Sequence, residues 1–538
     1  MSYNLSELFE RVADAVPERE AFVQGSRRLT FAALDERATR LANHLRSRGV
    51  GAGQHVGLLL MNGSEYLEGM LAAYKLRASA INVNYRYVEG ELRYLFDDSD
   101  LVALVTHRRF LPRVAAIAPE LPKLQHILVV EDGSDESADI DAVAYEEALA
   151  EASAERDFPG RTSDDIYVIY TGGTTGMPKG VMWRHEDIFF SAMGGGDPAG
   201  AGNPLKSPDD IASRVLPQSM AALAAPPLMH AAAQWSAFTQ LYGGGKVVVT
   251  EGGFDPEAIW EAVGREQVAV ITIVGDAMGT PLADALEANP TRFDTSSLIA
   301  LASGGALFSP STKERFLALL PGRMIIDTVG SSETGVMANS LQTSDSAPAG
   351  DQRFGINDQT QVLGDDNQPV APGSGQVGRL ARKARVPVGY YNDETKSRTT
   401  FVEIQGERWA LPGDMAVVEA DGSITLLGRG SVSINTGGEK VYPEEVELAL
   451  KAHPQIFDAV VVGVPDDRWG QRVVAVVQSR AGEAPGLEEL KDFCGSRIAS
   501  YKMPRDLVLV DQIVRSPAGK ADYPWARGHA MDALGIQA

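Results

Sequence analysis

The sequence predicts an α/β protein with a large N-terminal body of several subdomains, one of them rich in β-strands, and a small, mobile α+β domain after it. Before residue 353, short runs of Val and Ile alternate with amphipathic helical patterns, as in α/β folds. The length of 538 residues exceeds the roughly 250–300 residues at which a single hydrophobic core stops growing. The pattern then changes near residues 353 and 429, which predicts further structural units.

The N-terminal body opens with a helix followed by a strand. Apolar side chains spaced three and four apart predict a helix over residues 33–45, which Gly49 ends. The apolar run 56–60 predicts a buried strand. Four similar runs predict further strands at residues 101–105, 127–130, 246–249 and 268–273. The glycine-rich residues 194–202 predict a flexible loop.

The C-terminal part of the sequence follows two other patterns. Residues 353–428 contain short apolar runs broken by Gly, Pro and Asp, for example at 364–367 and 420–423, which predicts hairpins of a β-rich subdomain. The segment after it predicts helices and strands of an α+β domain at residues 444–452, 458–464, 473–478 and 487–498. Gly428 and Gly430 predict a hinge at residues 429–431, between an N-terminal domain of residues 1–428 and a C-terminal domain of residues 432–538.

The composition excludes several classes of function. With 49 Lys and Arg against 72 Asp and Glu, the net charge of −23 argues against a nucleic-acid partner and against anchoring to anionic membranes. No apolar run approaches the roughly 18 residues that cross a bilayer, so we expect no integral membrane association. Cys494 is the single cysteine, which excludes an intramolecular disulfide and favours a cytoplasmic protein. The oligomeric state stays open, with a homodimer as one alternative.

Residues 170–180 carry the strongest chemical signal. They hold four glycines, three threonines and Lys179, directly after the strand-like residues 166–169. Glycines allow close approach of the backbone, whose N–H groups can bind anionic oxygens together with the hydroxyls and the Lys charge. The segment is no Walker A loop, because Pro178 separates Lys179 from Gly176 and no Ser or Thr follows the Lys. It predicts a phosphate-binding loop, with a glycine-rich surface loop as the alternative.

This segment resembles the phosphate loop of the adenylate-forming superfamily, which includes acyl-CoA synthetases, firefly luciferases and the adenylation domains of peptide synthetases. Further segments resemble that family's motifs in the same order: residues 303–306, 330–334, 411–414, 429 and 516–520. The resemblance implies an ATP and AMP site made of Thr171, Gly172, Gly173, Thr174, Thr175, Gly176, Lys179, Ser303, Gly304, Gly305, Ala306, Asp327, Gly330, Ser331, Asp414 and Arg429.

The resemblance also implies roles for individual side chains. Ser332 would contact the α-phosphate, Glu333 would hold Mg²⁺ and Asp414 would bind both ribose hydroxyls. Lys520 would be the adenylation lysine, and His230 would border the substrate carboxylate, with a core histidine as the alternative. These roles suit the chemistry, because bringing a carboxylate onto the α-phosphorus of ATP requires a metal ion and cations that stabilise the developing charge.

Three positions depart from the family's pattern. Val329 stands where many relatives have a Tyr that stacks on adenine, and Pro412 replaces a Thr. Ser431 occupies the hinge position two residues after Arg429, where Asp or Lys is usual. Loss of the stacked ring, worth roughly 0.5–1.5 kcal/mol, predicts a lower affinity for ATP.

Two segments indicate the acceptor and the acid. Residues 434–443 are similar to the CoA-binding run of fatty-acyl- and aryl-CoA synthetases, which implies that Gly437, Gly438 and Glu439 bind CoA; a hairpin turn is the alternative. Residues 226–230 match the family's acyl-pocket segment. Small side chains and the absence of charge over residues 220–242 predict a pocket for a long or bulky apolar acid, with a packed Ala-rich helix as the alternative. The predicted pocket residues are Met229, His230, Ala233 and Trp235.

The sequence therefore predicts an ATP-dependent, AMP-forming acyl-CoA synthetase with Mg²⁺ as cofactor and ATP and CoA as co-substrates. Its local sequence resembles that of bacterial enzymes that act on fatty acids and steroid side chains. The expected substrate is therefore a medium- or long-chain fatty acid or a bulky steroid-type carboxylate. One alternative is an adenylating enzyme that hands its acyl group to a carrier protein or another acceptor. A more distant one is a non-catalytic relative that binds a nucleotide or lipid.

Overall fold

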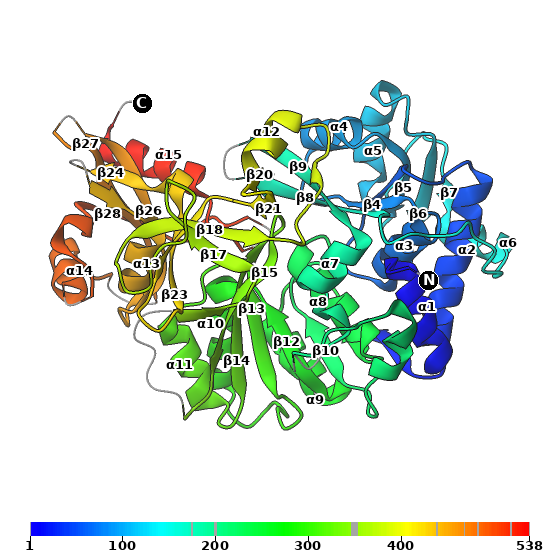
Figure 1. Cartoon of the computed structure of the whole chain (residues 1–538), viewed down its shortest axis with the longest axis horizontal. Helices are drawn as coiled ribbons and strands as arrows, with labels where there is room; N and C mark the ends of the chain where they lie inside the picture. The colour runs from blue at the N-terminus through cyan, green and yellow to red at the C-terminus, as the bar shows by residue number, and fades with distance from the viewer. Residues whose placement is uncertain are drawn as a thin grey trace.

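The chain folds into a large N-terminal body and a smaller C-terminal unit that packs against one end of it (Figure 1). The computed structural model describes residues 2–173, 176–197, 202–345, 353–436, 439–466, 468–480, 484–495, 497–516 and 519–536. Parallel and antiparallel sheets with helices between them make up the body, and the C-terminal unit has its own sheet and core. The predicted fold class is confirmed.

Five parallel strands form the first sheet, in the order β4-β3-β5-β6-β7. They are β3 (His55–Leu59), β4 (Ser79–Asn82), β5 (Leu101–His107), β6 (His126–Val130) and β7 (Val143–Ala144). Strand β3 is buried along its whole length, as its continuous apolar run predicts. The helices of this part are α1 (Leu5–Ala15), α2 (Phe31–Ser47), α3 (Ser64–Lys75), α4 (Glu89–Asp98), α5 (Leu111–Ile117) and α6 (Tyr145–Glu151). Helix α2 begins two residues before the predicted helix because the Thr30 hydroxyl accepts a hydrogen bond from Ala33 N.

A second sheet runs through the middle of the body in the order β2-β1-β11-β10-β12-β13-β14-β15. Its strands are β1 (Glu20–Gln24), β2 (Arg27–Thr30), β10 (Ala221–Ala224), β11 (Lys246–Val248), β12 (Val268–Ile273), β13 (Ala300–Gly304), β14 (Met324–Ser331) and β15 (Gly335–Gln342). The Ala-rich residues 221–224 form a buried central strand, so the alternative of an Ala-rich helix is wrong for them. It is right for residues 231–233, which open helix α8 (Ala231–Tyr242). The sheet's other helices are α7 (His185–Ala192), α9 (Pro256–Glu266), α10 (Gly275–Ala288) and α11 (Pro310–Leu319).

The β-rich subdomain extends this sheet, because its strand β16 pairs with both β15 and β23. Its strands are β16 (Arg353–Ile356), β17 (Thr360–Leu363), β18 (Val377–Lys383), β20 (Phe401–Ile404), β21 (Glu407–Ala410), β22 (Asp414–Val418) and β23 (Ile424–Arg429). The predicted turns are confirmed: Asn367 and Gly422 adopt positive φ angles of 61° and 84° in them. Helix α12 (Glu394–Thr400) lies between β19 (Gly389–Tyr390) and β20.

A small antiparallel sheet, β19-β9-β8, carries the predicted phosphate loop. Strand β8 (Ile166–Gly173) leads into the loop and β9 (Gly176–Arg184) leads out of it. The Asn82 side chain holds this sheet on the first one, since its Nδ2 donates to Tyr170 O (2.9 Å) and its Oδ1 accepts from Tyr170 N (2.7 Å). Asn82 Nδ2 also donates to Met229 O (2.8 Å), which fixes the segment before His230 beside the loop strand.

The C-terminal unit is an α+β domain, drawn in orange and red in Figure 1. Its strands are β24 (Ile434–Thr436), β25 (Glu439–Val441), β26 (Ile456–Asp466), β27 (Gly470–Ser479) and β28 (Asp506–Val510). Its helices are α13 (Pro443–Lys451), α14 (Leu487–Cys494) and α15 (Tyr523–Leu534). Pro443 occupies the first turn of α13, as predicted, whereas α14 ends four residues before the predicted end. Between β23 and β24, residues 430–432 form a single 3₁₀ turn at the predicted hinge.

The prediction of a flexible loop over residues 194–202 is wrong for its first three glycines, and its residues 198–201 lie outside the described residues. Gly194, Gly195 and Gly196 form a 3₁₀ turn with positive φ angles of 78°, 56° and 74°. Gly195 and Gly196 are buried in it, because their lack of a side chain allows both the left-handed backbone and close packing. Among the residues described, no helix is both long and apolar enough to span a bilayer.

Candidate active site

The predicted motifs meet at a cavity of about 160 Å³ between the N-terminal body and the C-terminal unit. The predicted site residues that line it are Gly305, Ala306, Asp327, Gly330, Asp414, Arg429 and Lys520. The cavity lies at the carboxyl ends of the parallel strands β13 and β14, where open α/β sheets bind ligands. Val329, the position predicted to face adenine, lines the same cavity. Segments more than 200 residues apart thus form one candidate active site.

Strand β13 positions one side of the cavity. Its last residues are Ser303 and Gly304, and Gly305 follows in a left-handed conformation (φ 85°) that favours glycine. The Ser303 hydroxyl accepts a hydrogen bond from Gly275 N (3.1 Å), so it fixes the start of helix α10. Asp327, on the neighbouring β14, is buried and forms an ion pair with Lys313.

The tight turn between β14 and β15 presents Glu333. Glu333 N donates to Ser331 Oγ (3.2 Å), and Trp183 Nε1 donates to the carbonyl of Ser332 (2.8 Å). The Tyr390 hydroxyl donates to Glu333 Oε1 (2.9 Å). Burial raises the pKa of Tyr390 first and the nearby Glu333 charge raises it further, so Tyr390 stays a hydrogen-bond donor at neutral pH. Trp183 and Tyr390 lie outside the predicted motifs, and neither was predicted as a site residue.

The Glu333 side chain fits the role of a Mg²⁺ ligand. In the described part of the chain no hydrogen bond reaches its Oε2, and no group of three or more His, Cys, Asp or Glu side chains could hold a metal alone. Nucleotide-bound Mg²⁺ needs only one or two carboxylates, because phosphate oxygens and water supply its other ligands. A single carboxylate such as Glu333 therefore fits what such an ion requires from the protein.

The opposite wall contains alternating charges. Asp414 and Arg429 face one another on strands β22 and β23, with Asp414 Oδ1 3.3 Å from Arg429 Nε. Asp414 raises the pKa of Arg429. Lys520 lines the same cavity, and its residue is exposed there. Loss of hydration among these neighbours first, and the Arg429 charge second, lower the pKa of Lys520. Glu333 and Asp414 lie close enough to oppose that shift.

Glu444 is a member of this wall that the sequence analysis missed. It lies in the first turn of α13 and lines the cavity. Burial raises its pKa to about 7, and the neighbouring carboxylates of Glu447 and Asp414 add to the effect. A side chain at Gly428 would displace Glu444, because its Cβ would lie 2.8 Å from the Glu444 carboxyl carbon. A Glu directly after a helix-starting Pro was the signal available in the sequence.

The phosphate loop is only partly described. Gly172 and Gly173 end β8, Gly176 begins β9, and Thr171 pairs with Lys179 across the two strands, whereas Thr174 and Thr175 lie outside the described residues. The Lys179 ammonium forms an ion pair with Asp393, the N-cap of α12. That hydrogen bond lowers the pKa of Asp393, which the sequence analysis did not predict as a site residue.

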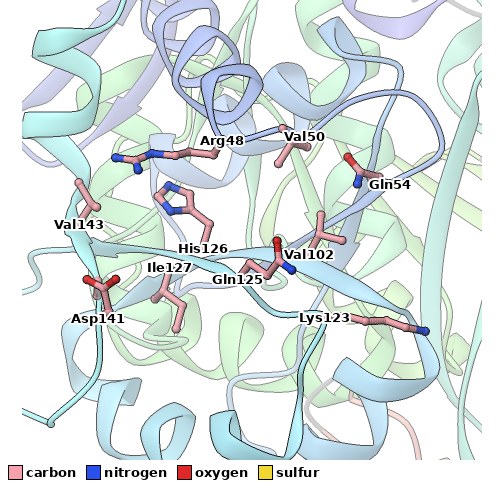
Figure 2. A pocket seen from close by; sticks show the side chains of 12 residues that line it. Arg48, Val50, Gln54, Val102, Lys123, Gln125, His126, Ile127, Asp141 and Val143 are labelled. Atoms are coloured by element: carbon pink, nitrogen blue, oxygen red, sulfur yellow. The ribbon is translucent and has the colours of Figure 1, made fainter.

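A second cavity, of about 470 Å³, lies at the amino ends of the first sheet's strands and contains none of the predicted motif residues. Figure 2 shows that its two cations, Arg48 and Lys123, extend in opposite directions, so they do not converge on one anion. Lys123 is already paired with Asp100 (2.6 Å). The smaller cavity of about 160 Å³ is therefore the candidate active site, although this second cavity is larger.

Comparison with known proteins decides the family. Residues 9–391 match the family model of the AMP-binding enzymes, and residues 445–520 match that of the AMP-binding enzyme C-terminal domain. The chain belongs to the AMP-binding enzyme family. The prediction of an adenylate-forming enzyme of the acyl-CoA synthetase type is confirmed.

Relatives of this AMP-binding enzyme match along its whole length. It is 50% identical to the 3-oxocholest-4-en-26-oate--CoA ligase of Rhodococcus rhodochrous, over 98% of this chain and 96% of the relative. It is also 50% identical to the medium/long-chain-fatty-acid--CoA/3-oxocholest-4-en-26-oate--CoA ligase of Mycobacterium tuberculosis H37Rv, with the same coverage. The medium-chain acyl-CoA ligase Mig of Mycobacterium avium is 43% identical over 99% of both chains.

Solved structures support the fold. The anthranilate CoA ligase AuaEII in complex with anthranoyl-AMP has a TM-score of 0.86 at 23% identity, covering 99% of this chain and 98% of that one. ATP-bound MatB from Rhodopseudomonas palustris has a TM-score of 0.82 at 23% identity, covering 99% and 100%.

His230 of the AMP-binding enzyme lies near Lys520. It occupies the N-cap position of α8 without a capping hydrogen bond, and its Nε2 is buried with no hydrogen-bond partner in the described part of the chain. Burial, followed by the charges of Lys520 and Arg86, lowers the pKa of His230 to about 4, so the imidazole is neutral at pH 7. An unsatisfied buried nitrogen costs about 1–3 kcal/mol, which a bound carboxylate or its water shell would recover.

The other predicted residues are divided between the core of the body and the surface. Met229 and Ala233 are buried in the core of the body. Trp235 is half-buried, and its Nε1 donates to the Tyr167 hydroxyl (3.2 Å). Glu439 begins the exposed edge strand β25, and Ser431 is exposed in the 3₁₀ turn after β23. Gly437 and Gly438 lie outside the described residues.

Proposed function

We propose that this AMP-binding enzyme joins apolar carboxylic acids to CoA in an ATP-dependent reaction that releases AMP and pyrophosphate. The observation that carries the proposal is the position of Lys520. It reaches from the C-terminal unit into a cavity that also holds the Asp414–Arg429 pair and lies next to Glu333. A mobile cation opposite a carboxylate that can hold a metal is the arrangement that carboxylate activation requires.

In the first half-reaction the substrate carboxylate attacks the α-phosphorus of ATP, and the bond to pyrophosphate breaks. Asp414 binds the ribose hydroxyls, Lys179 and the backbone of residues 171–176 bind the phosphates, and Ser332 contacts the α-phosphate. Glu333 would hold Mg²⁺, which neutralises charge on the phosphates. Lys520 binds the oxygens on which negative charge builds, and neutral His230 borders the carboxylate.

In the second half-reaction CoA replaces Lys520. The C-terminal domain, residues 432–538, rotates about residues 429–431 relative to the domain of residues 1–428. Removal of the Lys520 side chain admits CoA, for which Gly437, Gly438 and Glu439 are the proposed binding residues, and the CoA thiolate attacks the acyl carbonyl so that AMP leaves. Arg429 ends β23 directly before this turn, and a short turn between two strands can take up the backbone rotation of a hinge.

The proposed substrate is a medium- or long-chain fatty acid or a steroid-type carboxylate. Two observations support this class: the relatives named above, which match nearly the whole chain at 50% identity, carry such acids in their names, and residues 220–242 are free of charged side chains. A charged group deep in such a pocket would remain unpaired, which is costly. Met229, Ala233 and Trp235 are the proposed wall residues.

The test is product identification. The purified protein is incubated with ATP, Mg²⁺ and a pool of medium-chain, long-chain, aryl and steroidal carboxylates, with and without CoA, and the products are identified by mass spectrometry. We expect fatty-acyl-CoA or steroidal acyl-CoA together with AMP, only when CoA is present. Acyl-AMP that accumulates equally with and without CoA would contradict CoA as the acceptor, and aryl-CoA alone would contradict the substrate class.

A further inference from the structure

Four charged side chains form a chain from the N-terminal body to the loop that carries Lys520. Asp276 lies in the body, and Lys451, Asp458 and Arg515 lie in the C-terminal unit. All four side chains are at least 85% buried. We call this set the interdomain chain. Its members are absent from the motifs that identify the family.

The body fixes the first member rigidly. Asp276 Oδ1 accepts hydrogen bonds from Ser309 N and Ser309 Oγ, both at 3.0 Å. Gly275, just before it, adopts a φ of 53°, and a Cβ there would lie 2.2 Å from Leu307 O. Only glycine fits this backbone at residue 275, and the Ser309 hydrogen bonds hold Asp276 with its Oδ2 3.6 Å from Lys451 Nζ.

Lys451 connects the two parts of the molecule. It is the last residue of α13, and its carbonyl accepts a second contact from the body, Ser311 Oγ at 3.4 Å. Its ammonium also lies 3.0 Å from Asp458 Oδ1. With Asp276 on one side and Asp458 on the other, this buried cation is paired with a carboxylate from each domain.

The remaining members reach the loop of Lys520. Arg515 donates two hydrogen bonds of 2.7 Å to the Asp458 carboxylate and a third, of 3.0 Å, to the carbonyl of Gly519. Gly519 precedes Lys520 and packs on the turn that carries Asp276, since a Cβ at Gly519 would lie 3.3 Å from both Val274 Cγ1 and Ala277 Cβ. Asp276, the first member of the interdomain chain, and Gly519, on the loop of Lys520, therefore lie at the same turn of the body.

The geometry points to Lys451 as a positioning residue for the first half-reaction. The contacts among Lys451, Asp458, Arg515 and Gly519 lie within the C-terminal unit and move with it, whereas the pair with Asp276 spans the boundary and is lost when the unit rotates. The inference rests on the proposed function, because it assigns Lys451 to the arrangement in which Lys520 serves adenylation. Lys451 holds Lys520 in place there and has no such part in thioester formation.

The test measures the two half-reactions separately in Lys451→Met. Acyl-AMP and pyrophosphate formation is followed without CoA, and acyl-CoA formation is followed from supplied acyl-AMP. Because a displacement of about 1 Å can cost about 100-fold, we expect adenylation to fall by about 10–100-fold. Thioester formation should stay within about 2-fold, and Lys451→Arg should recover part of the adenylation rate, because it restores a cation that can pair with Asp276.

Asp276→Asn tests the same contact from the other domain. Asn keeps an oxygen for Ser309 and loses the charge that pairs with Lys451. Asp276→Asn should also lose adenylation while it keeps thioester formation. It replaces Lys451→Met as the test if a thermal unfolding assay shows that Lys451→Met does not fold. The double variant should lose no more adenylation rate than either single variant, because both remove one interaction.

Arg480→Gln is the matched control. Arg480 Nη1 lies 3.5 Å from Asp284 Oδ1, so this pair also crosses the domain boundary, but both side chains are partly exposed and neither belongs to the interdomain chain. Both half-reactions should stay within about 2-fold. Equal loss of both half-reactions in folded Asp276→Asn, or a selective loss of adenylation in Arg480→Gln as large as in Lys451→Met, would overturn the inference. A wild-type protein that forms no acyl-AMP would instead contradict the proposed function.

Discussion

The two walls of the active-site cavity are held by different kinds of contact. On the body's wall, the Glu333 turn is fixed by hydrogen bonds from Tyr390 and Trp183, both of which belong to the small sheet of the same body. On the opposite wall, Lys520 arrives on a loop that ion pairs hold against the body across a domain boundary. We call the first the fixed wall, because its contacts all lie within the body. We call the second the movable wall, because its contacts with the body cross a domain boundary and are lost when the C-terminal unit rotates.

This difference matches the division of labour in the proposed reaction. Phosphate and metal contacts serve both the attack on ATP and the retention of AMP, so their geometry gains from a rigid support. Lys520 serves one half-reaction only, so its support gains from being reversible. Variants on the two walls should therefore differ in which half-reaction they slow.

The largest effect is expected on the movable wall. Lys520→Ala removes the cation that faces the developing charge and should slow adenylation by about 10²–10³-fold. Thioester formation from supplied acyl-AMP should survive, because Lys520 has left the site in that step. Single-turnover assays of each half-reaction check this, and an equal loss of both would remove the distinction between the walls.

A change on the fixed wall should be less selective. Glu333→Gln keeps an oxygen for the Tyr390 hydroxyl but loses the charge for Mg²⁺. Since even residues behind metal ligands contribute about 10–100-fold, adenylation should fall by at least that factor and recover in part at high Mg²⁺ concentration. A Mg²⁺ titration of the adenylation rate in the wild type and the variant makes the measurement. An unchanged Mg²⁺ dependence would show that Glu333 holds no metal, and Tyr390→Phe is the control for the turn itself.

Local patterns in the sequence predicted most of the fold. Helix α2, strands β3, β5 and β12, and the turns of the β-rich subdomain follow from spacing and from Gly and Pro, which act within a few residues. Strand β10 could not be predicted this way. Its residues, 221–224, are three alanines and a leucine, and burial between β11 and β12 decides their conformation.

The motif residues could be predicted from the sequence, but the side chains that form hydrogen bonds and ion pairs with them could not. Tyr390 lies 57 residues from Glu333, Trp183 lies 149 residues from Ser332, and Asp393 lies 214 residues from Lys179. Nothing in the local sequence around a Tyr or Asp indicates a contact at such separations, since only the folded sheets bring these side chains together. The motifs contain the residues proposed to contact the substrates, whereas the side chains that fix these residues come from distant parts of the sequence.

The movable wall should also be the more sensitive to pH. The pKa of Glu444 is raised to about 7, above its ordinary value of 4.5, so between these values the native state keeps a proton that the unfolded chain loses. The stability that this group contributes is present at low pH and is lost as pH rises through about 7. Glu444→Gln stays neutral, so its unfolding midpoint should fall less than that of the wild type between pH 5 and 8.

Thermal unfolding of both proteins at several pH values measures this difference. Glu488→Gln, at an exposed position of α14, is the control and should follow the wild type. Parallel curves for the wild type and Glu444→Gln would place the pH-sensitive group elsewhere.

The smallest effect is expected at the phosphate loop of the fixed wall, and it concerns the ion pair between Lys179 and Asp393. Lys179 is paired with Asp393, and in the proposed reaction it exchanges this carboxylate for the phosphates of ATP. The two side chains are 39% and 25% exposed, and such pairs are worth about 0.2–1 kcal/mol. Asp393→Asn should therefore lower the dissociation constant for ATP by about 1.5–5-fold, as measured by calorimetry.

The Asn substitution isolates the charge, because an Asn side chain can still accept the hydrogen bond that Asp393 Oδ1 receives from Lys396 N (2.9 Å) and so still caps helix α12. The gain should shrink as salt concentration rises, since salt screens the pair that the wild type must break. If Asp393→Asn instead weakens ATP binding, the pair holds the loop in its binding shape. The fixed wall would then depend on a surface ion pair as the movable wall depends on Lys451 and Asp276, and the contrast between the two walls would be one of degree.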